Sequence, residues 1–392
     1  MKVLIIPSWY PTKENSLNGI FFKEQAEALK NCGLEVAVLY VNIISLKKFF
    51  SSKEKMGFQK ENENGLNVYR YNTFNYFPKM EALNIKYYIY VLSRCLTNVI
   101  KEEKNIDIIH AHSALLAGIG VNNIIKKFNI PYIITEHSSK FIRDLITKTQ
   151  KRYLYNAFKE ANAVIAVGNG LKQKLSEYTE FERINIIPNI LGLKSQNVKC
   201  DISKKRFRFF SLGFLQHNKG MDILIDAFIM FLNNYDVELF IGGEGEESEN
   251  LQKTIDNYNI NDKIKLLGVL NRDEVAYNMK NCDCFVLASR FETFGVVFIE
   301  ALSFGKPVIG TRSGGPDTII NNTNGMLVDV ENVNQLGKAM LTVMKCIDLY
   351  DSDAIKKDCY NRFSEEAVVG QICDVYSQVI GEKNYKVEDP IC

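Results

Sequence analysis

The sequence predicts an α/β protein made of two doubly wound domains, each a mostly parallel sheet covered by helices. Short β-branched runs such as 2–6 and 163–167 alternate with amphipathic helical segments, the order expected of βαβ units. At 392 residues the chain is long for one domain. A polar, unpatterned stretch at 191–205 predicts a linker between a first domain over 1–190 and a second that begins at 206.

Composition is typical of a globular enzyme, with 46% hydrophobic and 24% charged residues. No apolar run approaches the roughly 20 residues of a membrane-spanning helix. The apolar run at 3–6 is cut short by Pro7, so we expect no signal peptide. Nine cysteines occur without a repeated C-x-x-C, which predicts reduced thiols and a cytoplasmic protein.

Charge is distributed unevenly although the net charge is only +2. Residues 1–192 carry 26 Lys+Arg against 17 Asp+Glu, a balance of +9, and the remainder balances at −7. The first half could therefore face an anionic partner, such as a membrane surface. A lysine-rich solvated surface explains the charge equally simply. No nucleic-acid-binding motif is present, so we expect no nucleic-acid partner.

The chain opens with a predicted βαβ unit. A strand at 2–6 is followed by a long loop, an amphipathic helix at 21–30 and a second strand at 36–39. Gly19 stands just before the helix, where a glycine allows the backbone to approach a bound ligand. The absence of G-x-G-x-x-G argues against a nicotinamide dinucleotide site.

Residues 46–101 form an irregular, basic and aromatic region. The segment 87–99 reads as a buried helix with its tyrosines in the core. The two tips at 47–50 and 77–79 interleave lysines with aromatic residues, a pattern that also suits a membrane interface, and both interpretations stay open for them.

Histidines follow two predicted strands of the first domain. His112 ends the strand at 107–112 and shares its face with His110, while Glu136 and His137 follow the strand at 132–135. The carboxyl ends of parallel strands are where ligands bind in open α/β sheets, so these are candidate site residues. Buried core histidines would be the alternative. A metal site lacks a third ligand at recognisable spacing.

The second domain opens with a predicted strand near 207–212 and a helix at 221–231, with Lys219 just before that helix. A cation there is slightly unfavourable to the helix dipole, which favours a functional role. Gly243 lies in a tight turn after the strand at 237–241, and Val269 follows the strand at 264–267. The glycine turn at Gly243 suits the nucleotide end of a site, or merely a turn.

The most informative stretch runs from the predicted strand 284–288 into a helix that starts at Gly295. Glu292 lies in the turn before the helix, and Glu300 lies two turns along it. Eight helical residues rise about 12 Å, and the free amides of a helix N-terminus suit a diphosphate between the two carboxylates. The spacing alone fits two solvated glutamates equally well.

The surrounding residues resemble the donor-binding signature of the family 4 glycosyltransferases. They are Glu-x7-Glu with Phe-Gly after the first glutamate, Glu-Ala-Leu-Ser-Phe-Gly-Lys-Pro-Val-Ile-Gly-Thr from Glu300, and Ser-Gly-Gly-Pro-Asp from Ser313. The resemblance implies the GT-B fold, in which two Rossmann-like domains face each other across a cleft. It also implies a donor domain over 206–375 and a C-terminal segment, 376–392, that packs back on the first domain.

The resemblance further implies a retaining, metal-independent transferase of the hexosyltransferase type, with a nucleotide-diphosphate sugar as donor and no cofactor. Asp351-Ser352-Asp353 looks like a metal-binding D-x-D, but its place before a helix predicts an N-cap. Residues implied in catalysis are His112, Glu292 and Lys219. Residues implied in donor binding are Gly19, Gly243, Phe294, Gly295, Glu300 and Val269. Further candidates near the reacting groups are His137, Glu136 and Arg290.

The sequence departs from the family pattern at three positions. Phe214 stands where relatives carry an arginine beside the diphosphate, Asp317 where they mostly carry Glu, and Ile190 where they carry Gly. Arg290 or His217 could supply the missing charge. The expected product is a surface polysaccharide or glycolipid, made by transfer to a glycan or lipid-linked acceptor. A sugar-nucleotide epimerase and an inactive binding subunit are the alternatives.

Overall fold

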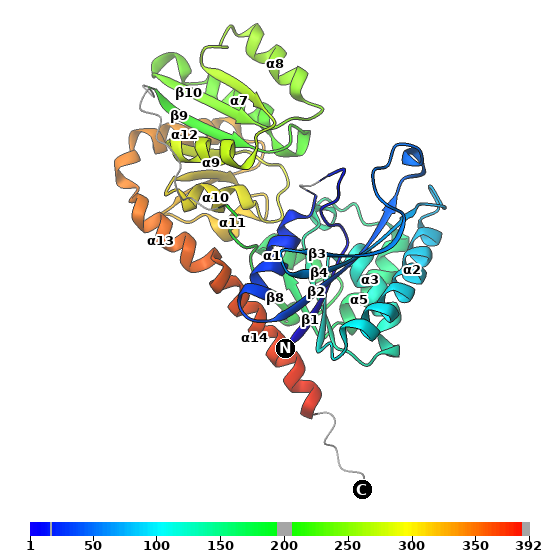
Figure 1. Cartoon of the computed structure of the whole chain (residues 1–392). Helices are drawn as coiled ribbons and strands as arrows, with labels where there is room; N and C mark the ends of the chain where they lie inside the picture. The colour runs from blue at the N-terminus through cyan, green and yellow to red at the C-terminus, as the bar shows by residue number, and fades with distance from the viewer. Residues whose placement is uncertain (16–17, 194–205, 386–392) are drawn as a thin grey trace. The chain divides into compact units, whose positions relative to one another are not determined.

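The computed structural model describes residues 1–15, 18–193 and 206–385, and it divides the chain into two compact units (Figure 1). The first unit holds Met1–Val167, Leu171–Ile190 and the helix α14 (Glu365–Tyr385). The second holds Gly168–Gly170 and Leu191–Ser364. Most of the expected linker, at 194–205, and the last seven residues of the expected tail, at 386–392, lie outside the described residues.

The first unit is built on an eight-stranded sheet in the order β3-β4-β2-β1-β5-β6-β7-β8. Every neighbouring pair is parallel except β3 and β4. The strands are β1 (Lys2–Pro7), β2 (Glu35–Ile44), β3 (Gly57–Glu63), β4 (Leu66–Phe74), β5 (Ile108–His112), β6 (Tyr132–Glu136), β7 (Ala163–Ala166) and β8 (Ile184–Ile186).

Helices cover this sheet in two groups. Helix α1 (Ile20–Asn31) packs beside α14, whereas α2 (Glu81–Glu103), α3 (Ile119–Ile124) and α5 (Lys148–Glu160) pack together (Figure 1). Two short helices, α4 (Ser139–Ile142) and α6 (Asn169–Leu175), follow β6 and β7. The arrangement confirms the predicted doubly wound sheet.

The expected boundary at residue 375 moves to 364, because all of α14 belongs to the first unit. Its apolar residues join the core that contains Phe22 of α1 and Ile5 of β1. These residues of α14 are Val368, Val369, Ile372, Val375, Tyr376 and Val379. Because their spacing spreads over three turns of one helix face, packing begins well before residue 376.

The β3–β4 hairpin is a feature that the sequence analysis missed. It occupies part of the region that was expected to be irregular, and its turn is Asn64-Gly65 with φ values of 49° and 79°. Asn-Gly with both residues at positive φ is the preferred two-residue hairpin turn. The polar sequence of β3 concealed the strand, since it lies at the edge of the sheet, where alternate residues are exposed.

The second unit is a six-stranded, fully parallel sheet in the order β11-β10-β9-β12-β13-β14. Its strands are β9 (Phe207–Leu212), β10 (Val237–Gly242), β11 (Ile264–Gly268), β12 (Cys284–Leu287), β13 (Val308–Thr311) and β14 (Gly325–Val328). Its helices are α7 (Met221–Ile229), α8 (Ser248–Asn257), α9 (Arg272–Asn281), α10 (Val296–Ser303), α11 (Pro316–Ile319), α12 (Val333–Lys345) and α13 (Ser352–Phe363). This unit is a second Rossmann-like domain, as predicted.

Two smaller expectations are also settled. Asp351 is the N-cap of α13, where its Oδ1 accepts from the amides of Asp353 and Ala354 at 2.9 and 3.0 Å, which confirms the predicted cap. Of the tyrosines expected in the core of α2, Tyr88 is buried, but Tyr90 is exposed. Within the described ranges, no helix is long and apolar enough to cross a bilayer, and the seven described cysteines are free thiols.

The hydroxyl of Tyr376 ties α14 to the sheet through a buried hydrogen bond with His110 Nδ1, 2.6 Å away. We expect Tyr376→Phe to destabilise the first unit by about 1–3 kcal/mol, because it leaves a buried imidazole nitrogen without a partner. Trp9 is the single tryptophan of the chain and lies in this unit, so its fluorescence during urea unfolding reports the change.

Tyr155→Phe is the matched control, since this tyrosine of α5 is 51% exposed. It should change the unfolding free energy by less than about 0.5 kcal/mol. Equal values for the two variants would show that the Tyr376 hydroxyl contributes nothing to the docking of α14.

Candidate functional site

Glu292 lies in the turn between β12 and α10, and backbone hydrogen bonds hold that turn against the end of β13. The Glu292 amide donates to Ser313 O at 3.3 Å, and the Gly315 amide donates to Glu292 O at 2.8 Å. Glu292 is 9% exposed. Its backbone is therefore fixed by the exit of the neighbouring strand, at the carboxyl edge where parallel sheets bind ligands.

Lys219 and Glu292, two of the predicted catalytic residues, form an ion pair although they are 73 positions apart. Lys219 Nζ lies 2.6 Å from Glu292 Oε2, with the side chains 20% and 11% exposed. The other carboxylate oxygen, Oε1, accepts from the Thr293 amide at 3.1 Å. The structure thus brings a cation and a carboxylate together at the amino end of α10.

A glycine allows this approach. Gly220 follows Lys219 with φ of 64°, and a Cβ at Gly220 would lie 2.0 Å from Ala288 O, after β12. A side chain here would force the Lys219 turn away from the β12 exit, so glycine is required for both conformation and space.

Gly295 is the N-cap residue of α10, one position before the helix begins and at the predicted start, and the helix has no side-chain cap. Gly295 has φ of 91°, and a Cβ there would meet the Phe298 ring at 2.7 Å. The amides at the start of an uncapped helix form an anion-binding end. Phe294 is 1% exposed and its ring packs against Phe363 at 5.9 Å, so only its backbone is available to a ligand.

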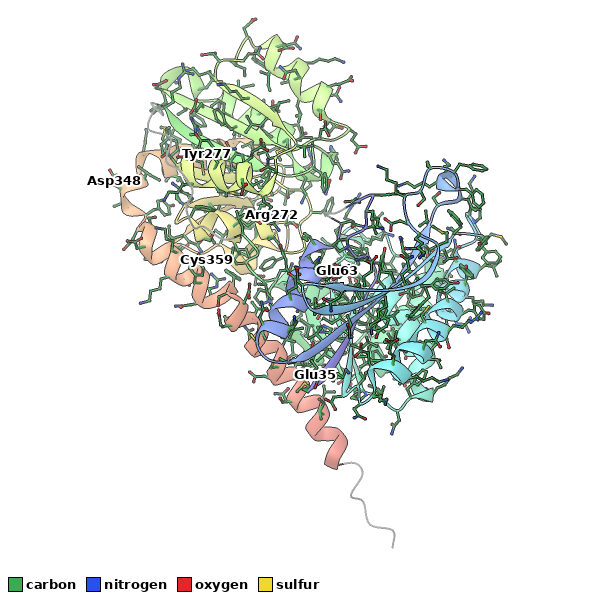
Figure 2. All side chains as sticks on the ribbon, viewed as in Figure 1. Glu35, Glu63, Arg272, Tyr277, Asp348 and Cys359 are labelled. Carbon is green, nitrogen blue, oxygen red and sulfur yellow. The ribbon has the colours of Figure 1, made fainter. Side chains whose placement is uncertain are left out.

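Glu300, the second glutamate of the pair, is 5% exposed and is bound by an arginine that the sequence analysis did not single out. Arg272 Nη1 of α9 lies 3.0 Å from Glu300 Oε1 (Arg272 is labelled in Figure 2). Arg272 follows a capping box whose signal, Asn271 with Glu274 three residues later, predicts the helix but not the ion pair. Glu300 is thus oriented from outside its own helix.

Arg290 is 9% exposed, and its guanidinium is engaged within the second unit. It donates to both carboxylate oxygens of Asp222 at 3.0 and 2.8 Å, to Glu331 Oε1 at 2.8 Å and to His217 O at 2.6 Å. Burial alone would raise the pKa of Asp222, but the hydrogen bonds from Arg290 lower it below its usual value. Two carboxylates therefore balance the charge that was expected to replace the missing family arginine. Phe214, at the position of that arginine, is 68% exposed.

Three glycines mark the exits of the neighbouring strands β9, β10 and β11. Gly243 has φ of 129°, and a Cβ there would lie 1.9 Å from Gly213 O, while its amide donates to Gly268 O at 2.7 Å. Val269, the residue after Gly268, is 63% exposed. The predicted nucleotide-end residues Gly243 and Val269 are thus adjacent to the same edge of the sheet.

In the first unit, three histidines form a buried cluster at the ends of β5 and β6. His110 and His112 stack with ring centroids 4.1 Å apart, and His112 Nδ1 lies 3.2 Å from His137 Nε2. His110 is held at both nitrogens, by the hydroxyls of Tyr376 and Thr135, each at 2.6 Å. The orientation of His112 is therefore set from both sides.

The cluster is electrically neutral. Burial lowers the pKa of His112 to about 3 and lowers the pKa values of His110 and His137 well below their ordinary range. Among the described residues, His112 Nε2 has no hydrogen-bond partner although it is buried. His137 Nδ1 is likewise buried without a partner among the described residues, and unpartnered buried nitrogens are costly.

Glu136 lies inside the unit with no exposed surface. Its carboxylate accepts from the amides of Ala114, His137 and Ser138 at 2.7 to 2.8 Å, which joins the segments after β5 and β6. Burial raises its pKa even though these amides lower it. Glu136 thus shapes the histidine cluster from within and presents no group to a ligand, contrary to the expected position.

Gly19 is the N-cap residue of α1 with φ of 74°. A Cβ there would lie 2.8 Å from Trp9 O, so the glycine permits the loop after β1 to pack against the start of the helix.

The histidine cluster predicts a dependence of stability on pH. Between the unfolded pKa near 6.5 and the folded value of His112 near 3, the unfolded chain binds a proton that the folded chain does not. Stability is therefore fully present above about pH 6.5 and falls as the pH decreases, by about 1.4 kcal/mol per pH unit for each such histidine.

His112→Gln should reduce this slope by about one proton in urea titrations followed through Trp9. His217→Gln is the control, since His217 is the one histidine of the chain outside the cluster and is exposed. An unchanged slope in His112→Gln would mean that folded His112 takes up its proton over the same pH range as the unfolded chain.

Comparison with known proteins agrees with this geometry. Residues 19–192 match the family model described as Glycosyltransferase Family 4, and residues 194–357 match the model described as Glycosyl transferases group 1. An uncharacterized glycosyltransferase of Methanocaldococcus jannaschii is 31% identical over 288 residues, which cover 72% of this chain and 78% of that protein.

Two solved structures share the fold over nearly the whole chain. Sucrose-phosphate synthase from Thermosynechococcus elongatus has a TM-score of 0.76 at 17% identity and covers 97% of this chain and 99% of its own. HepE from Anabaena, in complex with UDP, has a TM-score of 0.73 at 18% identity and covers 96% and 100%. With two family models and a relative above 30% identity, the chain belongs to glycosyltransferase family 4.

Proposed function

We propose that the protein is a retaining glycosyltransferase that moves a hexose from a nucleotide-diphosphate sugar to a hydroxyl acceptor. The observation that carries the proposal is the Lys219–Glu292 ion pair at the uncapped amino end of α10. A cation and free helix amides side by side suit a diphosphate, and a carboxylate beside them suits sugar hydroxyls.

The donor would extend along the edge of the second unit. In this proposal Lys219 and the amides that follow Gly295 bind the diphosphate, while Glu300, oriented by Arg272, accepts from ribose hydroxyls. The base lies near Gly243 and Val269, where the chain offers a tight turn and an exposed apolar residue. UDP is the first nucleotide to test, because HepE was solved with UDP.

The chemistry would proceed on one face of the sugar. As the bond from the anomeric carbon to the diphosphate oxygen breaks, Lys219 and the helix amides stabilise the negative charge on the leaving group. The leaving diphosphate takes the proton of the acceptor hydroxyl, whose oxygen bonds to the anomeric carbon on the same face. Glu292 orients the sugar hydroxyls, and its carboxylate steadies positive charge on the ring. The family resemblance assigns His112 a role toward the sugar as well.

No metal is needed in this scheme, since Lys219 and the amides supply the positive charge. We place the reaction in the cytoplasm, in line with the free cysteines, with peripheral membrane contact through the basic first unit. A surface polysaccharide or glycolipid is the proposed product.

One observation favours a second candidate, an inactive sugar-nucleotide-binding subunit. Phe214 replaces the family arginine, and the charge of Arg290 is balanced by Asp222 and Glu331. Slow donor hydrolysis without an acceptor would exclude this candidate, and epimerisation of the donor would instead indicate an epimerase.

A thermal-shift panel of UDP, GDP, ADP and their common sugars, with and without EDTA, tests donor binding. We expect one nucleotide to stabilise the protein by about 2.7 kcal/mol at 100 times its dissociation constant. The shift should persist in EDTA. Complete loss of the shift in EDTA would contradict the metal-independent scheme.

Glu292→Gln should lower turnover by about 10²–10³-fold, because it removes a charged contact that is preorganised for the transition state. Glu238→Gln is the matched control. Glu238 forms an equally short ion pair with Arg208, 2.6 Å, and the two side chains are 12% and 8% exposed. This pair lies at the amino ends of strands β10 and β9, away from the carboxyl edge of the sheet. Both variants should lose similar stability, and only Glu292→Gln should lose turnover. Equal turnover in the two variants would leave Glu292 with a structural role alone.

A further inference from the structure

A pocket of about 430 Å³ lies wholly within the first unit, at the carboxyl ends of its central strands. Trp9 follows β1, Leu115 follows β5 and Ser138 follows β6, while the start of α2 supplies Asn84 and Ile85. None of the residues assigned above to the donor lines it. Its volume falls within the range of pockets that hold small molecules.

The pocket carries an excess of positive charge. Lys79 and Lys140 both line it, and within the described parts of the chain neither ammonium group has a carboxylate partner. The one carboxylate, Glu81, accepts a hydrogen bond from Thr147 Oγ1 at 2.6 Å and lies in the first turn of α2, where the helix dipole favours it. The two free cations favour an anionic ligand.

The remaining surface of the pocket combines apolar walls with one unsatisfied polar group. Trp9, Ile85 and Leu115 supply an apolar side. Asn84 Oδ1 is buried and has no hydrogen-bond partner among the described residues. A buried amide oxygen without a donor is destabilising, and a hydroxyl group on the ligand would satisfy it. The ligand that fits is an anion with a hydroxyl group and an apolar portion.

The loop that brings Lys79 into the pocket also carries exposed apolar side chains. In residues 75–80, Tyr76 and Met80 are each 55% exposed. The loop after β2 emerges beside it, since Ile44 and Phe74 are register partners. There Phe50 is 98% exposed, and lysines 47, 48, 53 and 55 lie close to it in the sequence. Exposed aromatic side chains among lysines are typical of segments that enter the interface of an anionic bilayer.

We infer that this pocket binds the phosphate-bearing headgroup of a lipid acceptor. The phosphate lies between Lys79 and Lys140, a headgroup hydroxyl donates to Asn84, and the lipid chains stay in the bilayer that the two loops contact. The inference rests on the proposed transferase function, because it names the class of acceptor. In this inference the two basic tips at 47–50 and 77–79 form part of the acceptor site, where they contact the bilayer.

Trp9 provides a probe within the pocket, because it is the single tryptophan of the chain. The full-length protein would be titrated with phosphatidylglycerol in phosphatidylcholine vesicles, with pure phosphatidylcholine vesicles and with glycerol 3-phosphate. We expect the emission of Trp9 to change with the anionic vesicles and not with the neutral ones. Glycerol 3-phosphate should act only at far higher concentration.

Two pairs of variants separate the pocket from general surface charge. Lys79→Ala with Lys140→Ala should raise the lipid concentration of half-maximal response by about 5-fold per lysine. Lys101→Ala with Lys127→Ala removes the same charge from exposed positions outside the pocket and should change it by less than about 2-fold. Phe50→Ser should weaken the response to vesicles and leave the response to glycerol 3-phosphate unchanged.

Equal effects of the two lysine pairs, or no change in Trp9 emission, would contradict the inference that the pocket binds a lipid headgroup. If glycerol 3-phosphate and the lipid were equally potent, the pocket would still bind phosphate, but the inference that the phosphate belongs to a lipid would be wrong. Nucleotide binding keeps the two proposals distinguishable. If UDP, GDP and ADP all fail to bind while Trp9 emission responds to the lipid, the transferase proposal fails and the lipid-binding pocket stands. If a nucleotide binds while Trp9 emission does not change, the transferase proposal stands and the lipid-binding pocket fails.

Discussion

The ion pair between Lys219 and Glu292 is the interaction on which the second unit's candidate site depends. It joins the turn after β9 to the turn after β12, and Gly220 permits the approach. Because both side chains are mostly buried, each charge needs the other, and loss of one would leave an uncompensated charge. A bound diphosphate would compete with Glu292 for Lys219. The pair can thus hold the empty site in order and release its cation to a ligand.

In the first unit, buried hydrogen bonds rather than an ion pair hold the candidate site residues in place. Its histidines are neutral, and Tyr376, Thr135 and the carboxylate of Glu136 fix their surroundings through buried hydrogen bonds. Tyr376 belongs to the last helix, which makes the C-terminal part of the chain necessary for the geometry around His112. Among the described residues, two ring nitrogens of this network, His112 Nε2 and His137 Nδ1, are buried without a hydrogen-bond partner. A neutral buried network with unpartnered ring nitrogens is suited to hydrogen bonds with sugar hydroxyls.

The sequence predicted the candidate site best where the residues that fix the local structure are close together in the chain. The β12–Glu292–α10 stretch combines an apolar strand, a glycine start and a helix, so its order follows from residues close in the chain. The contacts of Arg272 with Glu300, and of Arg290 with Asp222, join distant segments and have no local signal. The β3–β4 hairpin was missed although Asn64-Gly65 marks its turn, because a polar edge strand lacks the apolar alternation that identifies buried strands.

Two buried groups that lack hydrogen-bond partners belong to the sites proposed above. A buried nitrogen of His112 and a buried oxygen of Asn84 lack partners within the described chain, and Phe50 is almost fully exposed. Other buried groups also lack partners, among them His137 Nδ1 and Ser113 Oγ, whereas the Glu136 carboxylate accepts from three amides. An unsatisfied buried group lowers stability, and a ligand that reaches His112 Nε2 or Asn84 Oδ1 would supply the missing partner. The sugar, the acceptor headgroup and the bilayer would each supply what one of these groups lacks.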